Sequence, residues 1–581
     1  MIARAPSSSL DAPRSNTPMR ARLARLQADE LFGYVVLGST WVLSFVRLRY
    51  GVDFTDEAWY AAVTQRFVLG DRPYLDEVQL RQTANLLTVP LYYAYLKCVG
   101  STDGVIYFLR VAYFSSVQLA VSWAAYRLAC AHASRVAAII IAAVPLAFMP
   151  FEIPTFSYNN IGGSMFALGS LVGLRATLEA RSGRPLLAAG VIHGIACLGY
   201  PPLGPAVLLY SVCIYFTAPR AAAVSCARLS LAHAAGVALV AVLFLVGFLP
   251  SLLEGLPHML GYETAITHPR DFTKFVRLLT WIAVLSPAYP LWLLAIVSAA
   301  LLARHHLASR LYVFVALTLI AVLWCTHTHF DREDVLRRDV LSNHLVIYVA
   351  LLGALFLPFS AQGALRRALW LLGWLPGVAS GLIMSMSSDN LGSMNAGIGC
   401  FVAALVSMLG LARVQPTVTP PSRAARVVLA SGLALVPAGM QANNYAFAYR
   451  DVPPLEADAT VHTGPYLGLR GERRMVELAE ELTLELRARV RPGERMLAYY
   501  ATPAGYLFAA ARPAFPITWT DAYESLPGLL PYYRRHRTGR GLVLVLHPTP
   551  SNWPELRALV EDPARLIKDA GRYQLYREPP P

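Results

Sequence analysis

The stretch GVDFTDEAWYAAVTQRFVLGDRPYLDE, Gly51 to Glu77, holds six acidic side chains in 27 residues, and two of them, Asp56 and Glu57, are adjacent. It follows an apolar run at 31–48, in a chain of 581 residues of which 56% are hydrophobic and 15% charged, with a mean hydropathy of +0.45. This is more apolar side chain than one soluble core uses. We therefore predict a protein that crosses a membrane several times, with the acidic stretch between two crossings.

Apolar segments recur from Leu31 to about Gln441. Each has about 16 to 24 residues, which lets a helix cross a hydrocarbon layer of roughly 30 Å. The pattern predicts thirteen segments: 31–48, 106–128, 137–151, 160–177, 186–200, 203–218, 231–252, 278–302, 310–325, 341–358, 369–386, 393–412 and 427–441. The fifth and sixth flank GYPPLGP (Gly199–Pro205), where a proline-broken re-entrant turn is the alternative.

Arginines indicate the orientation. They gather in the N-terminal tail and in every second loop, which hold almost no acid except Glu179; examples are Arg20, Arg22, Arg25, Arg127, Arg135, Arg181, Arg184, Arg220, Arg304, Arg366, Arg367 and Arg423. Loops rich in arginine stay on the cytoplasmic side. The tail is therefore expected inside, and the loop with the acidic stretch outside. An odd number of crossings also puts the region after 441 outside.

Three parts are predicted along the chain. Residues 1–30, rich in Pro, Ser and Arg, are expected to be a disordered cytoplasmic tail. Residues 31–441 form the membrane region, with a first exterior loop at 49–105, and its first apolar run is expected to remain as an anchor. Residues 442–581 alternate helical spacing with the strand-like runs ERMLAYY, GLVLVLHP and RYQLYRE, which is typical of a small α/β domain. The fold class is thus an all-α polytopic membrane protein with an exterior α/β domain.

Within the first loop we expect a helix from Thr55, as the capping residue, to about Leu69, ended by Gly70. Trp59, Tyr60, Val63 and Phe67 would form its apolar stripe, so that it lies in the plane of the membrane surface. Acids in the first turn are favoured by the helix dipole. Asp56 and Glu57 therefore have a structural explanation as well as a functional one. The other four acids, at positions 53, 71, 76 and 77, are expected to be mostly solvated.

The runs DEAWYAAVTQRFVLGDRPYLD and VPLYYAYLKCVGSTDGVIYFLRVAYF resemble the start of the GT-C superfamily of membrane glycosyltransferases, in the branch of protein O-mannosyltransferases and lipid A aminoarabinose transferases. The resemblance is detailed over roughly residues 31 to 200. It implies Asp56 as a catalytic or acceptor-binding carboxylate with Glu57 beside it, and a polyprenyl-phosphate sugar as donor. It also marks Asp76, which closes a shared G-x-x-P-Y-x-D pattern, and Glu152, because related transferases use an acid in the second exterior loop.

This chemistry needs a base for the acceptor hydroxyl and cations for the phosphate, because a sugar phosphate already has a stable leaving anion. Asp56 would be the base, in one displacement with inversion. The candidate cations are exterior: Arg81, next to Gln82, stands where relatives have Lys-Pro-Pro, and further along the chain come His268, Arg270, Lys274, His327, His329, Arg332, Arg337 and Arg338. Each of these residues is also explained by solvation or by pairing with a nearby acid.

We expect no metal and no cofactor, since the acidic pair is not a DxD motif and the H-x-H-x-D run at His327 is a poor predictor of metal binding. The partners implied are the lipid-linked donor, a hydroxyl acceptor (glycolipid, polysaccharide or protein) and membrane lipids, with no nucleic acid. The location is the outer face of a bacterial cytoplasmic membrane. Alternatives are a transporter or lipid flippase, and a GT-C ligase or polymerase that uses a diphosphate-linked glycan. Transport usually needs ionisable groups near the bilayer midplane, where His193 is one of few.

Overall fold

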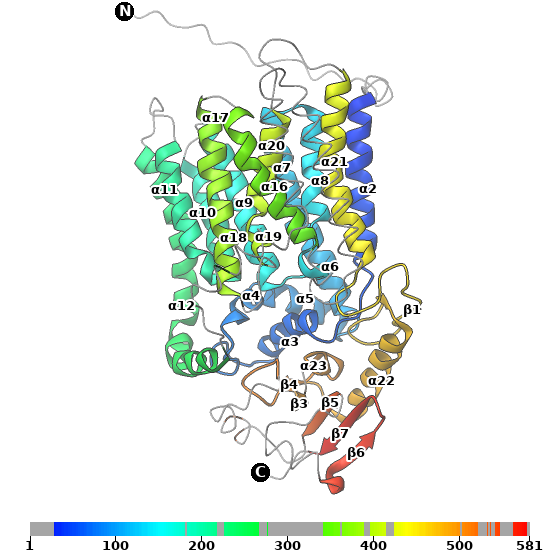
Figure 1. The fold of residues 1–581 in the computed structure, drawn as a ribbon. Helices are drawn as coiled ribbons and strands as arrows, with labels where there is room; N and C mark the ends of the chain where they lie inside the picture. The colour runs from blue at the N-terminus through cyan, green and yellow to red at the C-terminus, as the bar shows by residue number, and fades with distance from the viewer. Residues whose placement is uncertain are drawn as a thin grey trace, which may run out of the picture.

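A bundle of helices forms the larger part of the molecule (Figure 1). The computed structural model describes residues 28–179, 183–217, 226–266, 276, 341–360, 363–388, 395–413, 423–499, 502–520, 532, 535, 541–546 and 562–577. The helices of the bundle are α2 (Ala28–Arg47), α6 (Val105–Tyr113) continued by the π-helical turn η2 (Phe114–Gln118) and α7 (Leu119–His132), α8 (Arg135–Ala147), α9 (Tyr158–Leu178), α10 (Gly183–Gly199), α11 (Gly204–Thr217), α12 (Cys226–Ile266), α16 (Leu341–Ser360), α17 (Gly363–Ala368) with η6 (Leu369–Trp374) and α18 (Leu375–Ser387), α19 (Ala396–Gly399), α20 (Phe401–Ala412) and α21 (Arg423–Ala446).

Eleven of the thirteen predicted apolar segments coincide with these helices, and the other two, 278–302 and 310–325, lie outside the described residues. In the part described, four helical stretches are long and apolar enough to cross a membrane: Val105–His132, Tyr158–Leu178, Cys226–Leu260 and Gly363–Ser387. The count of thirteen crossings therefore stays a prediction. Around GYPPLGP, α10 and α11 are separate helices of the bundle joined by the short 3-10 turn η4 (Pro201–Leu203), as the pattern predicts.

Helices α10 and α12 cross at small residues. A Cβ added at Gly190 would lie 2.0 Å from the carbonyl oxygen of His233, and one at Gly236 would lie 2.2 Å from that of Leu187. Small residues let helices in a bundle approach closely. The close crossing brings His193 and His233 into contact, with 2.8 Å between Nδ1 of the first and Nε2 of the second. His193 is thus paired, which the sequence spacing does not indicate.

The first loop forms a layer across one end of the bundle, built from α3 (Asp56–Val68), η1 (Leu80–Gln82), α4 (Thr83–Leu86) and α5 (Val89–Val99) (Figure 1). The expected stripe of α3 is present, and Trp59, Tyr60 and Val63 pack into the core of the bundle. The opposite face, with Ala58 and Ala61, packs into a second core shared with the C-terminal region. Helix α3 is therefore covered by protein on both sides, where the sequence predicted one face against lipid.

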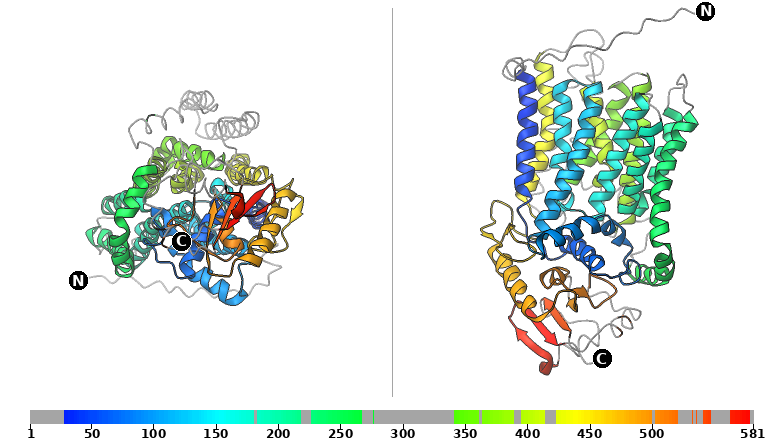
Figure 2. Two further views of the ribbon diagram at one scale, coloured as in Figure 1. Left: turned by 90° about the horizontal axis from the view of Figure 1, so that it is seen from below. Right: turned by 180° about the vertical axis from the view of Figure 1, so that it is seen from behind.

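The C-terminal region lies beyond this layer, so that bundle, first-loop helices and sheet follow one another (Figure 2). Its elements are β1 (Ala459–Thr460), β2 (Arg470–Gly471), α22 (Arg473–Arg489), β3 (Arg495–Tyr499), α23 (Ala504–Phe508), β4 (Arg512–Pro513), β5 (Leu542–Leu546), η7 (Pro563–Arg565), β6 (Leu566–Asp569) and β7 (Tyr573–Arg577). The larger sheet has the order β4-β3-β5-β7-β6. Strand β3 runs parallel to β4 and β5, and β7 runs antiparallel to β5 and β6. The three predicted strands are confirmed as β3, β5 and β7.

Aromatic contacts join the first loop to this region. The ring of Phe54 lies 5.6 Å from that of Tyr466 and 5.3 Å from that of Phe508. Gln65 Nε2 donates to the carbonyl oxygens of Tyr506 and Ala511, each at 2.9 Å. A buried amide that bonds two backbone carbonyls fixes the register between its own helix and the segment it contacts. The C-terminal region is therefore built onto the first loop, and the two share one hydrophobic core.

Candidate active site

Helix α3 begins at a buried aspartate. The Asp53 carboxylate accepts hydrogen bonds from the backbone N–H of Thr55 at 2.9 Å and of Glu57 at 2.8 Å, and from the Thr55 hydroxyl. The predicted cap by Thr55 is therefore wrong, because its hydroxyl donates to Asp53 and leaves the helix N–H groups to that carboxylate. Burial raises the pKa of Asp53 to about 7, and the nearby Asp56 carboxylate adds to this rise. Asp53 is a structural cap with an altered proton affinity.

Asp56 is the first residue of α3, where the helix dipole stabilises negative charge. Its Oδ2 accepts a hydrogen bond from the hydroxyl of Tyr449 and lies 3.7 Å from Arg450 Nη2. The side chain is 32% exposed. Among the residues that the structure describes, none donates a hydrogen bond to Oδ1. Asp56 is thus a carboxylate with one oxygen fixed by the protein and one left for another molecule.

Tyr449 and Arg450 follow helix α21, at the junction with the C-terminal region. The Arg450 guanidinium lies over the Tyr449 ring at 5.2 Å and faces the Trp519 ring at 6.0 Å. Burial, and after it the Asp56 carboxylate, raise the pKa of Tyr449 well above its usual value. The hydroxyl therefore stays protonated at neutral pH and remains a donor to Asp56. None of these three residues was selected from the sequence, since only the fold brings positions 449, 450 and 519 to position 56.

Arg81 lies beside an aromatic cluster formed by Trp59, Tyr60, Tyr158 and Tyr200. Its guanidinium carbon is 5.6 Å from the centre of the Tyr158 ring, and that ring stacks on Tyr200 at 5.7 Å. Burial raises the pKa of Tyr60 well above its usual value; the Asp56 carboxylate adds to the rise and the Arg81 guanidinium opposes it. Both charges therefore act on one hydroxyl. Tyr60 stands four residues after Asp56 on α3, so the predicted base and the predicted cation Arg81 both border this aromatic cluster.

Glu57 lies in a different environment from its neighbour. Arg110 Nε donates to Glu57 Oε1 at 2.7 Å, and Arg110 Nη2 contacts the other carboxylate oxygen. The same guanidinium donates to the backbone oxygens of Leu48, Tyr50 and Gly51. Both side chains are almost fully buried. A bidentate pair of this kind holds the loop onto the bundle, because breaking it would leave a charge buried without a partner.

Glu152 is also held in a buried ion pair. Its Oε1 accepts from Asn443 Nδ2 at 2.6 Å, and its Oε2 lies 3.6 Å from Arg47 Nη2. Arg47 and Arg110 both donate to the Tyr50 carbonyl oxygen at 2.8 Å. The Glu152 and Glu57 pairs are therefore neighbours. Phe151 and Glu152 each have a φ of 56°, a left-handed conformation that costs free energy and is kept only where surrounding contacts impose it.

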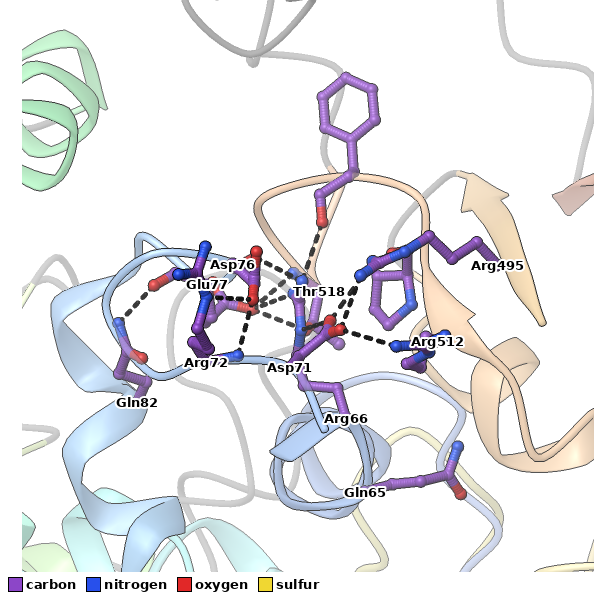
Figure 3. Close-up of polar contacts among 12 residues, drawn as sticks. Gln65, Arg66, Asp71, Arg72, Asp76, Glu77, Gln82, Arg495, Arg512 and Thr518 are labelled. Carbon is purple, nitrogen blue, oxygen red and sulfur yellow. Dashed lines mark hydrogen bonds and ion pairs between the residues drawn. The ribbon is translucent and has the colours of Figure 1, made fainter. Parts of the chain in front are cut away.

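Asp76 belongs to a second charged network, centred on Arg66 (Figure 3). Arg66 lies between two acids, with Nε 3.0 Å from Asp71 and Nη1 2.8 Å from Glu77. It also donates to the carbonyl oxygens of Asp76 and Phe515 and to the Thr518 hydroxyl. The Asp76 carboxylate accepts from the Arg72 backbone N–H at 2.7 Å and from the Tyr532 hydroxyl at 3.2 Å. These hydrogen bonds and the nearby arginines keep the pKa of Asp76 below its usual value, although burial opposes them.

The expectation that the other acids of the opening stretch are solvated is wrong. Their exposed fractions are small: Asp53 3%, Asp71 4%, Asp76 9% and Glu77 0%. Asp71 forms an ion pair with Arg495 at 2.7 Å, and Glu77 accepts from the backbone and hydroxyl of Thr518. Arg495 and Thr518 lie more than 400 residues further along the chain than these two acids. Sequence patterns around the acids could not reveal that the C-terminal region covers them.

Several predicted residues lie outside the described part of the chain. They are the cations of the two later loops that the sequence predicts to be exterior: His268, Arg270, Lys274, His327, His329, Arg332, Arg337 and Arg338. Within the residues described, no group of three His, Cys, Asp or Glu side chains could hold a metal ion. The roles of these cations and the absence of a metal stay predictions.

Comparison with known proteins gives little at the level of sequence. No family model and no curated protein matches the chain. Among solved structures, the chain is similar to the crystal structure of ArnT from Cupriavidus metallidurans in the apo state. The two chains are 14% identical, the TM-score is 0.41, and the alignment covers 95% of this chain and 98% of that one.

Proposed function

We propose that this protein is an integral-membrane glycosyltransferase that moves a sugar from a polyprenyl-phosphate donor to a hydroxyl acceptor at the outer face of a bacterial cytoplasmic membrane. One observation carries the proposal. Of the six acids in the opening stretch, five are buried and bonded within the protein, whereas Asp56 is 32% exposed and keeps Oδ1 open among the described residues. A base must reach a proton on another molecule, so accessibility selects Asp56.

The proposed reaction is one displacement. Asp56 Oδ1 takes the proton of the acceptor hydroxyl while the oxygen of that hydroxyl forms a bond to the anomeric carbon. The bond from this carbon to the phosphate oxygen breaks, and the polyprenyl phosphate leaves with the electron pair. Attack from the side opposite the leaving group inverts the anomeric configuration. Because phosphate is a stable anion, no strong acid is needed on the leaving side, but a cation there lowers the barrier.

Arg81 is the first candidate for that cation. It is exposed, and it lies beside the aromatic cluster that contains Tyr60, whose pKa the Asp56 carboxylate helps to raise. Aromatic rings next to polar groups suit a sugar, whose C–H faces pack on rings while its hydroxyls form hydrogen bonds. Glu57 and Glu152 we propose as structural acids, since their carboxylates are held by Arg110 and Arg47.

The rival function, transport, draws support from the histidine pair in the bundle. His193 and His233 are fully buried, and their other ring nitrogens contact the hydroxyls of Ser170 and Ser211 at 3.1 and 2.7 Å. Such a chain of polar groups inside a bundle could carry protons. The same contacts also hold α10 against α12, and both histidines are far from Asp56 along the chain. The experiment must therefore separate transfer from transport.

The purified protein, reconstituted in liposomes, is incubated with a panel of radiolabelled polyprenyl-phosphate sugars and a membrane extract as acceptor source. We expect one donor to be consumed, with the label appearing in a product that is no longer bound to polyprenyl phosphate. Consumption of a nucleotide sugar instead would refute the donor class. Movement of an intact lipid-linked sugar across the bilayer without bond cleavage would support the rival function.

A further inference from the structure

The turn Ala448–Asp451 is held rigidly between the bundle and the C-terminal region. On the bundle side, Arg47 Nη2 donates to the carbonyl oxygen of Phe447 at 3.0 Å. On the other side, the Asp451 carboxylate accepts from the backbone N–H groups of Val52 at 2.7 Å and of Glu472 at 3.0 Å. A Cβ at Gly471 would lie 2.4 Å from Asp451 Oδ2, so the glycine makes room for this carboxylate. The turn is thus hydrogen-bonded to the bundle, to the first loop and to the C-terminal region.

Arg450 has an unusual backbone within this turn. Its φ is 53°, in the left-handed region that is unfavourable for residues with a side chain. Residues held in such conformations cluster at functional sites, where neighbouring contacts impose them. The consequence here is that two consecutive side chains both reach Asp56: the hydroxyl of Tyr449 contacts Oδ2, and Nη2 of Arg450 lies 3.7 Å from the same oxygen.

The Arg450 guanidinium is not saturated by its ion pair. The 3.7 Å separation from Asp56 exceeds a hydrogen-bond distance, and the side chain is 42% exposed. Its guanidinium carbon lies 5.2 Å from the centre of the Tyr449 ring and 6.0 Å from that of the Trp519 ring. An exposed guanidinium held beside aromatic rings can bind a phosphate with two parallel hydrogen bonds. By contrast, the N–H groups of Arg47, Arg66 and Arg110 donate to buried carboxylates and backbone oxygens.

We infer that the Ala448–Asp451 turn completes the active site: Arg450 binds the phosphate of the lipid-linked donor, and Tyr449 is a positioning residue that orients the Asp56 carboxylate. This rests on the proposed function and extends it, because it makes the start of the C-terminal region part of the site. Negative charge grows on the phosphate as the sugar leaves, and a guanidinium beside it stabilises that charge. The Tyr449 hydrogen bond to Oδ2 leaves Oδ1 directed to the acceptor.

The test uses the full-length protein in neutral detergent micelles, with the donor found active in the panel and with its product, the polyprenyl phosphate, as a binding probe. Arg450→Gln is expected to raise the donor KM and the Kd for polyprenyl phosphate by about tenfold or more, and Arg450→Lys to recover part of this loss. Tyr449→Phe is expected to lower kcat by about tenfold with KM nearly unchanged, because it disturbs the base and not the phosphate site. Arg473→Gln, at an exposed pair with Asp458, is the matched control.

The outcomes separate the inference from the function on which it rests. If the wild type transfers sugar and Arg450→Gln keeps the KM and Kd of the control, the inference is wrong and the proposed function stands. If the wild type transfers nothing from any polyprenyl-phosphate sugar and does not bind polyprenyl phosphate, the inference and the proposed function are both wrong. The measurements are repeated with anionic phospholipid added to the micelles; an Arg450 effect seen only with that lipid would mean that the arginine binds lipid headgroups instead, which also overturns the inference. Folding is checked for each variant by its thermal midpoint.

Discussion

The two ends of helix α3 carry charge in opposite ways. At its start, Asp56 is 32% exposed and its ion pair with Arg450 is 3.7 Å long. At its end, Arg66 is fully buried and bonded to Asp71, Glu77 and Thr518. A saturated network is costly to disturb and gives nothing to a substrate, whereas an unsaturated one can exchange a partner. The end of α3 with Arg66 thus serves assembly, and the end with Asp56 has the open carboxylate that the proposed chemistry needs.

The largest effect on stability is expected at the end of α3 that contains Arg66. Arg66→Met removes the cation between Asp71 and Glu77 and leaves two buried carboxylates without it. We expect the first loop and the C-terminal region to lose about 3 to 5 kcal/mol of stability, the usual effect of breaking a buried pair. The measurement is the thermal midpoint in detergent, together with hydrogen exchange of β3 and α23.

The control for Arg66→Met is Arg72→Gln. The Arg72 side chain is 67% exposed, and its ion pair with Asp76 is 3.6 Å long. A long ion pair whose cation is exposed to solvent contributes about 1 kcal/mol at most, so this variant should unfold nearly as the wild type does. Equal stability of the two variants would mean that the Arg66 network does not hold the layers together.

Glu57→Gln tests whether Glu57 and its neighbour Asp56 have different roles. It leaves the buried Arg110 without its anionic partner, so we expect a loss of about 3 kcal/mol in stability. The folded fraction should still transfer sugar within a few-fold of the wild-type rate, because Glu57 has no accessible oxygen to act as a base. A variant that folds normally and has lost transfer would reassign catalysis to Glu57.

The raised pKa of Asp53 should make the stability of the protein depend on pH, with a smaller effect than the substitutions above. Its pKa is raised to about 7 in the folded protein, while an unfolded chain releases this proton near pH 4. Between these values the folded state binds more protons, so its stability falls as the pH rises from about 4 to about 7 and is level above that. The wild type should therefore lose roughly 2 to 3 kcal/mol between pH 5 and pH 8 from this group.

Asp53→Asn should flatten that dependence, because an amide does not titrate, while a weaker cap lowers stability at every pH. The thermal midpoints of both proteins are compared across the range. Other buried acids with raised pKa values, Glu77 and Asp451, act in the same direction in both proteins and cancel in the difference. Parallel curves for the two proteins would show that Asp53 is already ionised at pH 5.

Much of the fold follows from the sequence because local rules determine it. Apolar runs predicted the helices of the bundle, and the runs ERMLAYY, GLVLVLHP and RYQLYRE predicted β3, β5 and β7. The strands β4 and β6 were missed: Arg512–Pro513 is two residues long, and Leu566–Asp569 has no alternating pattern. The cap at Asp53 was missed because Thr55 fits the local preference equally well, and only the observed hydrogen bonds distinguish the two residues.

The site was predictable only in part, for a physical reason. Asp56 could be selected because a motif and the helix start coincide there. Its surroundings could not, since Tyr449 and Arg450 reach it across 393 positions of the chain. In the same way, the burial of Asp71 and Glu77 depends on Arg495 and Thr518, which no pattern near the acids records. Contacts between distant segments decide which acid is left open, and the local sequence carries no signal for them.

Asp56 is the proposed base, and its replacement tests the proposed chemistry most directly. Asp56→Asn keeps the size of the side chain and an oxygen to accept from Tyr449, but it removes the basic carboxylate. We predict that the rate of transfer from the active polyprenyl-phosphate sugar falls by about a thousandfold or more, while the thermal midpoint stays within a few degrees of the wild type. Transfer at a rate within tenfold of the wild type, from a protein shown to be folded, would contradict the claim that this end of α3 performs the chemistry.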